Sequence, residues 1–372
     1  MRIKFARPKL GPPEFKAVQE AMKRSRLTNA GNVQAFENKF SEMIGGGMAV
    51  ATSSCTSALH LALLSLGIGR GDEVIVPALS FAACAHVIEA VGATPIFADV
   101  HPEAGQLDPE DVEPRITPRT KAIMVMHFAG RAGYMGSFKA IVRRHPHIRI
   151  IEDAATALGA RHSSTHVGLL GSVGCFSFHP VKHITTCEGG MLVTHDAEIA
   201  ARAKLIREFG KETSPYDQQN GRSPMPYEIK SFGLNFRMTE LSGALGVAQL
   251  DSARKRLEIR RSNYRKLLHA LSGLEILDLG GDESAAYCMV VHMPKGRDAF
   301  AVRRALAVRH IETSVYYPGP LPLMPYYKNK YRPEDFPHAT RIAQNAIALS
   351  VGPHLGSAEM AYTAQQLKEV LK

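Results

Sequence analysis

The chain has 372 residues, of which 45% are hydrophobic and 22% are charged. This length and balance predict a globular protein with a large core and two domains. Its five cysteines have no Cys-x-x-Cys spacing, which argues against a disulfide framework or zinc site and favours a reducing compartment. The first residues lack the apolar core of a signal peptide, and no apolar run could span a bilayer. We therefore expect a cytoplasmic protein without a membrane contact or a bound metal.

The formal net charge of +10 at pH 7 could attract nucleic acid or a small anion such as a nucleotide diphosphate. Many basic residues fall between Arg254 and Lys266 on an expected helix, interleaved with Leu, Ile and Tyr. That pattern is typical of a solvated helix face. Because no helix-turn-helix, finger or RNP signature accompanies it, we expect a small anionic partner and no nucleic acid.

Hydrophobic periodicity and turn residues predict alternating helices and strands in the first part of the chain. A first helix begins after Gly11-Pro12-Pro13, since proline suits a first helical turn, and ends near Arg24. Alternation of this kind indicates an α/β fold, a mostly parallel sheet with helices on both faces and a ligand at the carboxyl ends of the strands. The further elements are helices at Val33–Ile44, 58–66, from Ser80-Phe81, Leu107–Arg115 and Ser137–Arg144, and strands at Met48–Thr52, Glu73–Pro77, Thr94–Ala98 and Ala122–His127.

Five small residues, Ser53 to Ser57, open the apolar helix at 58–66. Small hydroxyl residues at a helix N-terminus place free N–H groups and side-chain donors where a phosphate can bind. The same residues are also consistent with a plain helix cap.

A short strand through Ile150 and Ile151 ends at Asp153. Side chains alternate along a strand, so Asp153 and Ala155 project to the same side. A carboxylate there can pair with a protonated pyridine nitrogen, and a small alanine leaves room for a flat ring, as pyridoxal phosphate requires. Taken alone, an aspartate at a strand end is more often a helix cap.

The stretch Cys175–Met191 carries one lysine, Lys182, with Pro180 before it and Gly189-Gly190 after it. Proline and glycine here predict a shaped loop between two strands. A lysine that loses its proton through partial burial or a nearby cation can form a Schiff base with a carbonyl cofactor. A surface lysine on a turn is the alternative, and the apolar run before Lys182 argues against it.

Beyond a strand at Met191–Thr194 and a helix at Ala197–Phe209, the segment Gly210–Lys230 is predicted to be a long polar loop. One helix from Thr239 to about Leu271 is expected to link a large domain, residues 1–250, to a small α+β domain, residues 251–372. The small domain is expected to contain strands at Glu275–Leu279, Tyr287–Met293 and Glu312–Tyr317 and a helix at Arg297–His310.

Three motifs occur in the order seen in a known family: I-E-D-A-A at 151–155, S-F-H-P-V-K-H-I-T-T-C-E-G-G at 177–190 and G-L-N-F-R-M-T-E at 233–240. Over nearly its whole length the chain resembles the nucleotide-sugar aminotransferases of the DegT/DnrJ/StrS family. The resemblance implies a fold-type I enzyme with pyridoxal phosphate as cofactor. It also implies a homodimer, glutamate as amino donor and a keto-sugar carried by a nucleotide as acceptor.

The resemblance also implies roles for single residues. Lys182 would carry the cofactor and then move the proton between carbon centres, and Asp153 would keep the ring nitrogen protonated. The remaining matched positions are Thr56, Ser57 and Ser177 for the cofactor phosphate, Phe81 for stacking on the ring, and Asn235 for the phosphate in the partner subunit.

Three positions depart from the family pattern. Cys55 stands where glycine is commoner, and Tyr316 stands where a histidine near the substrate is usual. Thr156 replaces a Gln or His near the ring hydroxyl and is kept as a candidate cofactor contact through its own hydroxyl.

Two alternatives stay open. In a 3-dehydratase of the same family a histidine replaces the lysine, and His183 is one position away, although Pro180 and Glu188-Gly189-Gly190 align Lys182 with the lysine. A regulatory protein could keep the fold without the chemistry. The pattern H-P-x-K-x-I-T-x-x-E-G-G resembles relatives that act at carbon 4, which predicts a 4-keto-6-deoxy sugar as acceptor.

Overall fold

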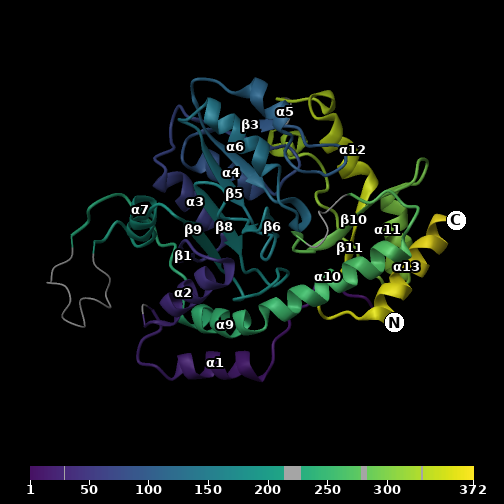
Figure 1. Cartoon of the computed structure of the whole chain (residues 1–372), viewed down its shortest axis with the longest axis horizontal. Coiled ribbons are helices and arrows are strands. Elements are labelled where there is room, and N and C mark those ends of the chain that lie inside the picture. Colours follow the sequence, from purple (N-terminus) through teal and green to yellow (C-terminus); the bar gives the residue numbers. More distant parts are fainter. Residues whose placement is uncertain (29, 213–227, 278–282, 328–329) are drawn as a thin grey trace.

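The computed structural model describes residues 1–28, 30–212, 228–277, 283–327 and 330–372. Its centre is a seven-stranded sheet in the order β1-β9-β8-β5-β4-β2-β3 (Figure 1). Neighbouring strands are parallel from β8 to β3, whereas β9 is antiparallel to both β1 and β8. The predicted mostly parallel α/β sheet is confirmed. Its strands are β1 Met48–Thr52, β2 Glu73–Pro77, β3 Thr94–Ala98, β4 Thr120–Met126, β5 Arg149–Asp153, β8 Val173–Ser177 and β9 Gly190–Thr194.

Helices cover both faces of this sheet, because alternate strand residues enter two separate cores. Val74, Met124 and Ile151 pack with α3 (Cys55–Ser65), α4 (Ala82–Ala90) and α7 (Ala197–Arg207). On the opposite face, Ile75, Ile123 and Ile150 pack with α2 (Asn32–Ile44) and α6 (Met135–Arg144). The remaining elements of this part are α1 Pro12–Met22, α5 Pro109–Val112, the short hairpin β6 Arg161–His162 and β7 Thr165–His166, and two 3-10 turns, Glu113–Arg115 and Phe128–Gly130.

The predicted single linking helix is wrong, because two helices, α9 (Glu240–Asp251) and α10 (Ala253–Ala270), meet at Ser252. The Ser252 hydroxyl donates to the Gln249 carbonyl at 3.5 Å, a local bond that competes with regular helix geometry. Figure 1 shows α10 extending from α9 toward the small sheet near both chain ends.

The C-terminal part contains an antiparallel pair, β10 (Cys288–His292) and β11 (Ala346–Ser350). The predicted strands at Glu275–Leu279 and Glu312–Tyr317 are reduced to single bridges, Ile276 with Val291 and Ser314 with Ala348. Residues 278 and 279 lie outside the described residues, as does most of the predicted loop at Gly210–Lys230. The accompanying helices are α11 Ala299–Val308, α12 Pro337–Asn345 and α13 Ser357–Leu371, with 3-10 turns at Leu321–Leu323, Pro325–Tyr327 and Pro333–Asp335.

One continuous core joins the small sheet to one face of the large sheet, with Tyr264 and Leu267 of α10 between them. The division into domains near residue 250 therefore stays a prediction. Within the described residues, no helix has the length and apolar character needed to cross a membrane.

The carboxyl end of β5 is anchored by Glu152, whose side chain is fully buried. One of its oxygens lies 2.9 Å from His127 Nε2, while His127 Nδ1 accepts the Gly133 amide at 3.0 Å, which places the ring proton on Nε2. Burial raises the pKa of Glu152, but the hydrogen bonds from His127 and from backbone amides outweigh it and hold the pKa below its usual value. The backbone amides that donate to Glu152 are those of Gly168 at 2.7 Å, Leu170 at 2.8 Å and Gly171 at 2.6 Å.

We expect Glu152→Gln to lower the free energy of unfolding by about 3 kcal/mol near neutral pH, because the amide N–H₂ group faces other donors. The pKa of Glu152 is lower in the folded chain than in the unfolded chain, where it is about 4.3, so its ionised carboxylate stabilises the fold above this pH. This stabilisation is lost as the pH falls from about 4.3 through the folded-state pKa. The variant should therefore lose less stability than the wild type on acidification.

Urea denaturation between about pH 2.5 and pH 7 measures both effects, because the acid loss lies below the unfolded pKa of about 4.3. Glu113→Gln is the matched control, since Glu113 pairs with Arg144 at 2.6 Å with 44% of its side chain exposed. If wild type and Glu152→Gln lose the same free energy of unfolding on acidification, the role given to this carboxylate is contradicted.

Candidate active site

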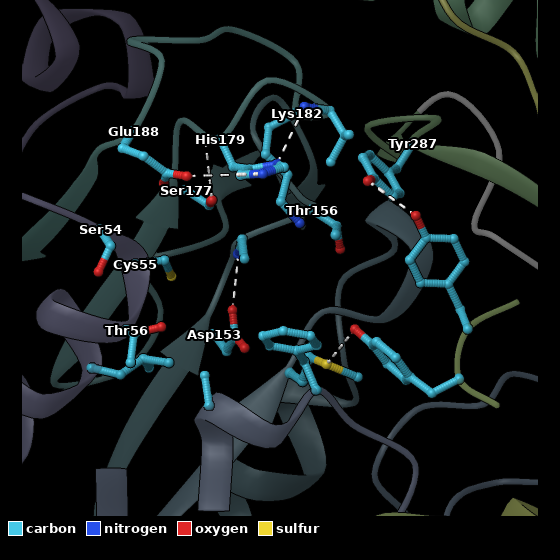
Figure 2. A pocket seen from close by; sticks show the side chains of 18 of the residues that line it. Ser54, Cys55, Thr56, Asp153, Thr156, Ser177, His179, Lys182, Glu188 and Tyr287 are labelled. Atoms are coloured by element: carbon cyan, nitrogen blue, oxygen red, sulfur yellow. Dashed lines mark hydrogen bonds and ion pairs between the residues drawn. The ribbon is translucent and has the colours of Figure 1, made fainter. Parts of the chain in front are cut away.

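A cavity of about 410 Å³ opens at the carboxyl ends of the parallel strands (Figure 2). The strand ends contribute Met126 from β4, Asp153 from β5 and Ser177 from β8. Most of the predicted cofactor residues line it, and the structure thus brings together segments that are far apart in the sequence. They are Thr56, Phe81, Asp153, Ala155, Thr156, Ser177 and Lys182.

The Asp153 carboxylate is held at both oxygens, and its residue is only 5% exposed. Oδ1 accepts the Ala155 amide at 2.9 Å, and Oδ2 accepts the Cys84 thiol at 3.1 Å. Asp153 and Ala155 border the same cavity, and the carboxylate keeps unused lone pairs for a donor placed inside it.

Lys182 lies in the predicted loop between β8 and β9, where its amide donates to the His179 carbonyl at 2.9 Å. Its Nζ is 5.3 Å from the centre of the Tyr287 ring. Figure 2 shows Lys182 and Asp153 on opposite sides of the cavity. A flat ring between them could present one end to an amine and the other to a carboxylate.

Gly190, the second glycine after Lys182, allows close packing against α3. A Cβ atom on Gly190 would lie 2.3 Å from the Ser54 carbonyl oxygen and 2.6 Å from the Cys55 nitrogen. This approach brings the start of β9 against the helix N-terminus, where Ser54 Oγ caps the Ser57 amide at 3.0 Å. The first amides of a helix have no partner within it, so Cys55 and Thr56 offer theirs at the cavity wall.

Two predicted contacts lie outside the cavity lining. The Ser57 hydroxyl is 2.9 Å from the hydroxyls of both Ser53 and Ser54, within the helix cap. Asn235 is exposed, and its Oδ1 accepts the Arg237 amide at 3.4 Å. Their proposed phosphate contacts stay predictions.

Thr156 is 6% exposed and donates its hydroxyl proton to the His127 carbonyl at 3.0 Å. Because a hydroxyl has one proton, Thr156 can then only accept a hydrogen bond from a group in the cavity. If Thr156, a candidate contact of the cofactor's ring hydroxyl, is to donate to that hydroxyl, this bond must break.

Sequence reasoning missed most of the aromatic wall of the cavity. Tyr287 begins a predicted strand, and the hydrophobic pattern alone does not distinguish it from a core residue. Its hydroxyl accepts a hydrogen bond from Tyr316 at 3.1 Å, and Tyr317 donates to Met126 Sδ at 3.6 Å. Burial raises the pKa of Tyr316 and of Tyr317, so both stay protonated donors. The Tyr-Tyr pair before a proline was the available signal for this wall.

His183 is not among the residues that line the cavity, although its ring centre lies 5.6 Å from that of Tyr287 in the cavity wall. It is buried, with Nε2 2.9 Å from the Ala285 carbonyl oxygen. Burial, with a contribution from the Arg260 charge, holds the pKa of His183 well below its usual value. Of the two neighbours, Lys182 therefore lines the cavity and His183 does not, and the catalytic role of Lys182 stays a prediction.

In the part of the chain that the structure describes, no three His, Cys, Asp or Glu side chains gather as a metal ion would require. The chemical groups that do gather fit pyridoxal phosphate. An amine stands ready for its aldehyde, a carboxylate for its ring nitrogen and a helix N-terminus for its phosphate.

Comparison with known proteins agrees with this chemistry. A model of the DegT/DnrJ/EryC1/StrS aminotransferase family matches residues 8–368. The spore coat polysaccharide biosynthesis protein SpsC of Bacillus subtilis is 31% identical over 380 residues, which cover 100% of this chain and 97% of SpsC.

Two solved structures are similar over all or nearly all of their lengths. Spr1654 of Streptococcus pneumoniae in its PLP form has a TM-score of 0.92 and 26% identity, covering 100% of this chain and 99% of that one, and it is also known in a PMP form. DesI, solved in the presence of its TDP-sugar product, has a TM-score of 0.87 and 29% identity, covering 100% and 93%.

The fold and the cavity define a fold-type I aminotransferase that uses pyridoxal phosphate. The chain belongs to the DegT/DnrJ/EryC1/StrS family of pyridoxal-phosphate-dependent sugar aminotransferases, as its motifs predicted.

Lys182 should be the residue that holds the cofactor covalently. Borotritide treatment of the cofactor-loaded protein should remove its yellow colour and leave the label on a Lys182 peptide, because hydride fixes the bond between amine and aldehyde. Peptide mapping locates the label.

Lys182→Ala should bind the cofactor without covalent attachment, since the phosphate and ring contacts remain. Lys121→Ala, at the far end of β4, should label like the wild type. A label on any other lysine would refute the assignment.

Proposed function

We propose that the protein is a cytoplasmic homodimeric enzyme that transfers an amino group from glutamate to a keto-sugar linked to a nucleotide. The observation that carries this proposal is that Lys182 and Asp153 border one cavity together with the N-terminus of α3. Similarity to DesI and the net charge of +10 favour an anionic nucleotide as the carrier.

Bound pyridoxal phosphate supplies an electron sink for the carbon that gains or loses the amino group. Lys182 anchors the aldehyde and, once free, moves a proton at that carbon, while Asp153 keeps the ring nitrogen protonated. Thr56 and Ser177, with the first amides of α3, hold the phosphate. Phe81, a cavity-lining ring that is 59% exposed, offers an apolar face for stacking.

The sugar enters between two unlike walls. On one side stand the tyrosines Tyr287 and Tyr316, joined through their hydroxyls. On the other side the Glu188 carboxylate lies 3.9 Å from His179 Nε2 and can accept bonds from sugar hydroxyls. We propose that these walls present carbon 4 of a 4-keto-6-deoxy sugar to Lys182.

Matched 3-keto and 4-keto nucleotide sugars with glutamate test the acceptor directly. We expect turnover of the 4-keto compound, with NMR showing the new C–N bond at carbon 4. Turnover of the 3-keto compound alone would refute carbon 4 as the aminated position but would leave the aminotransferase activity standing. A product that has lost its carbon-3 hydroxyl without gaining nitrogen would instead identify a dehydratase.

The proposed dimer places Asn235 at the cavity of the partner subunit. Asn235 is exposed, and Phe232, three residues before it, is 69% exposed. Exposed Phe15 and Met22 add apolar surface on α1. In the proposed dimer, a second copy covers Phe232 and receives the Asn235 amide at its cavity.

Mixing inactive Lys182→Ala subunits with Asn235→Ala subunits should restore roughly a quarter of the activity. Half of the randomly mixed dimers are then hybrids, and each hybrid has one intact site of two. Unmixed variants assayed at the same total concentration are the control. No recovery, despite exchange of subunits shown by native mass spectrometry, would contradict the shared site.

A further inference from the structure

Cys84 is a fully buried residue of α4 whose side chain reaches the predicted catalytic carboxylate. Its Sγ lies 3.1 Å from Asp153 Oδ2. Its backbone amide donates to the Phe81 carbonyl at 3.0 Å, so the first turn of the helix fixes where the thiol stands. Across the described residues, Cys84 is the only side chain hydrogen-bonded to this carboxylate.

The thiol keeps its proton and acts as a donor. Burial raises the pKa of Cys84 well above its usual value, and the Asp153 charge adds to the shift. The other titratable groups that Asp153 influences are Cys55 on α3, Cys175 on β8 and Tyr317, and burial raises the pKa of each. Near neutral pH these neighbours are uncharged, and Lys182 lines the same cavity on the side opposite Asp153.

We propose that Cys84 is a positioning residue for Asp153, and that a thiol at this place leaves the carboxylate basic enough to retain the proton on the cofactor's ring nitrogen. The inference rests on the proposed role of Asp153. An S–H group is a weak donor, so it orients Oδ2 while drawing little charge from it. A hydroxyl at the same place would make a charge-assisted bond that is shorter and stronger.

The two substitutions at Cys84 should change, in different ways, the pH at which the ring nitrogen loses its proton. Cys84→Ser strengthens the donor, stabilises the free carboxylate and should lower the pH at which the ring nitrogen loses its proton by about one unit. Cys84→Ala removes the donor, so that pH should stay equal or rise. Because Oδ2 is then free to turn, cofactor affinity should weaken by a few-fold.

The measurement is the ¹⁵N chemical shift of ring-labelled pyridoxal phosphate bound to the whole protein, followed with pH. Pyridinium and pyridine nitrogens have well separated shifts, so the titration reports the proton itself. Cys288→Ser is the matched control, because Cys288 is an equally buried thiol on β10 with no hydrogen bond to Asp153. The pH dependence of kcat should shift in parallel.

The proposal is supported if the pH at which the ring nitrogen loses its proton follows the order Cys84→Ala ≥ wild type > Cys84→Ser. A purely structural role would shift this pH in the same direction in both variants. Titrations of both variants that coincide with the wild type would overturn it, as would an upward shift for Cys84→Ser. If Cys84→Ser does not fold, Cys84→Ala is sufficient as a test. The proposal is then overturned if the ring nitrogen of Cys84→Ala loses its proton at a lower pH than in the wild type. A wild-type ring nitrogen that is neutral at pH 7 would instead refute the role of Asp153.

Discussion

Two neighbouring carboxylates at the end of β5 face opposite sides of the sheet, and the site depends on this arrangement. Strand alternation points Glu152 into the core beneath α2 and α6, while Asp153 points toward α3 and α4. Glu152 accepts bonds from His127 and from three backbone amides, so its charge is satisfied without solvent. The strand end that presents Asp153 is therefore fixed from behind.

His127 extends this fixed point to the neighbouring strand. Its amide donates to the Asp153 carbonyl at 2.9 Å, and its carbonyl accepts the Thr156 hydroxyl at 3.0 Å. The segments that follow β4 and β5 are thus joined by main-chain and side-chain bonds around one buried ring. A cofactor held at this edge meets donors and acceptors that are already oriented, which lowers the reorganisation needed during reaction.

The residues that sequence could identify lie within short motifs with local chemical meaning. Asp153 closes a recognisable strand, Lys182 sits between a proline and a glycine pair, and Thr56 opens a helix. Each of these positions is marked by backbone rules that act over a few residues. The pattern of apolar runs likewise predicts the order, along the chain, of the strands and helices that form the large sheet and its covering layers.

Contacts between distant segments could not be predicted in the same way. Tyr287 reaches Lys182 only because α10 carries the chain back to the sheet, and Cys84 reaches Asp153 only through helix packing. The break at Ser252 coincides with a weak local hydrogen bond that helix propensity does not reveal. The hydrogen bond from the Thr156 hydroxyl to the His127 carbonyl likewise depends on tertiary structure.

The central claim is that Lys182 and Asp153 act on the two ends of one cofactor within this cavity. A crystal structure of the protein loaded with pyridoxal phosphate tests it most directly. The account predicts continuous density from Lys182 Nζ to the cofactor, with the ring nitrogen within hydrogen-bonding distance of the Asp153 carboxylate. A cofactor attached to another lysine, or one whose ring nitrogen faces away from Asp153, would contradict it.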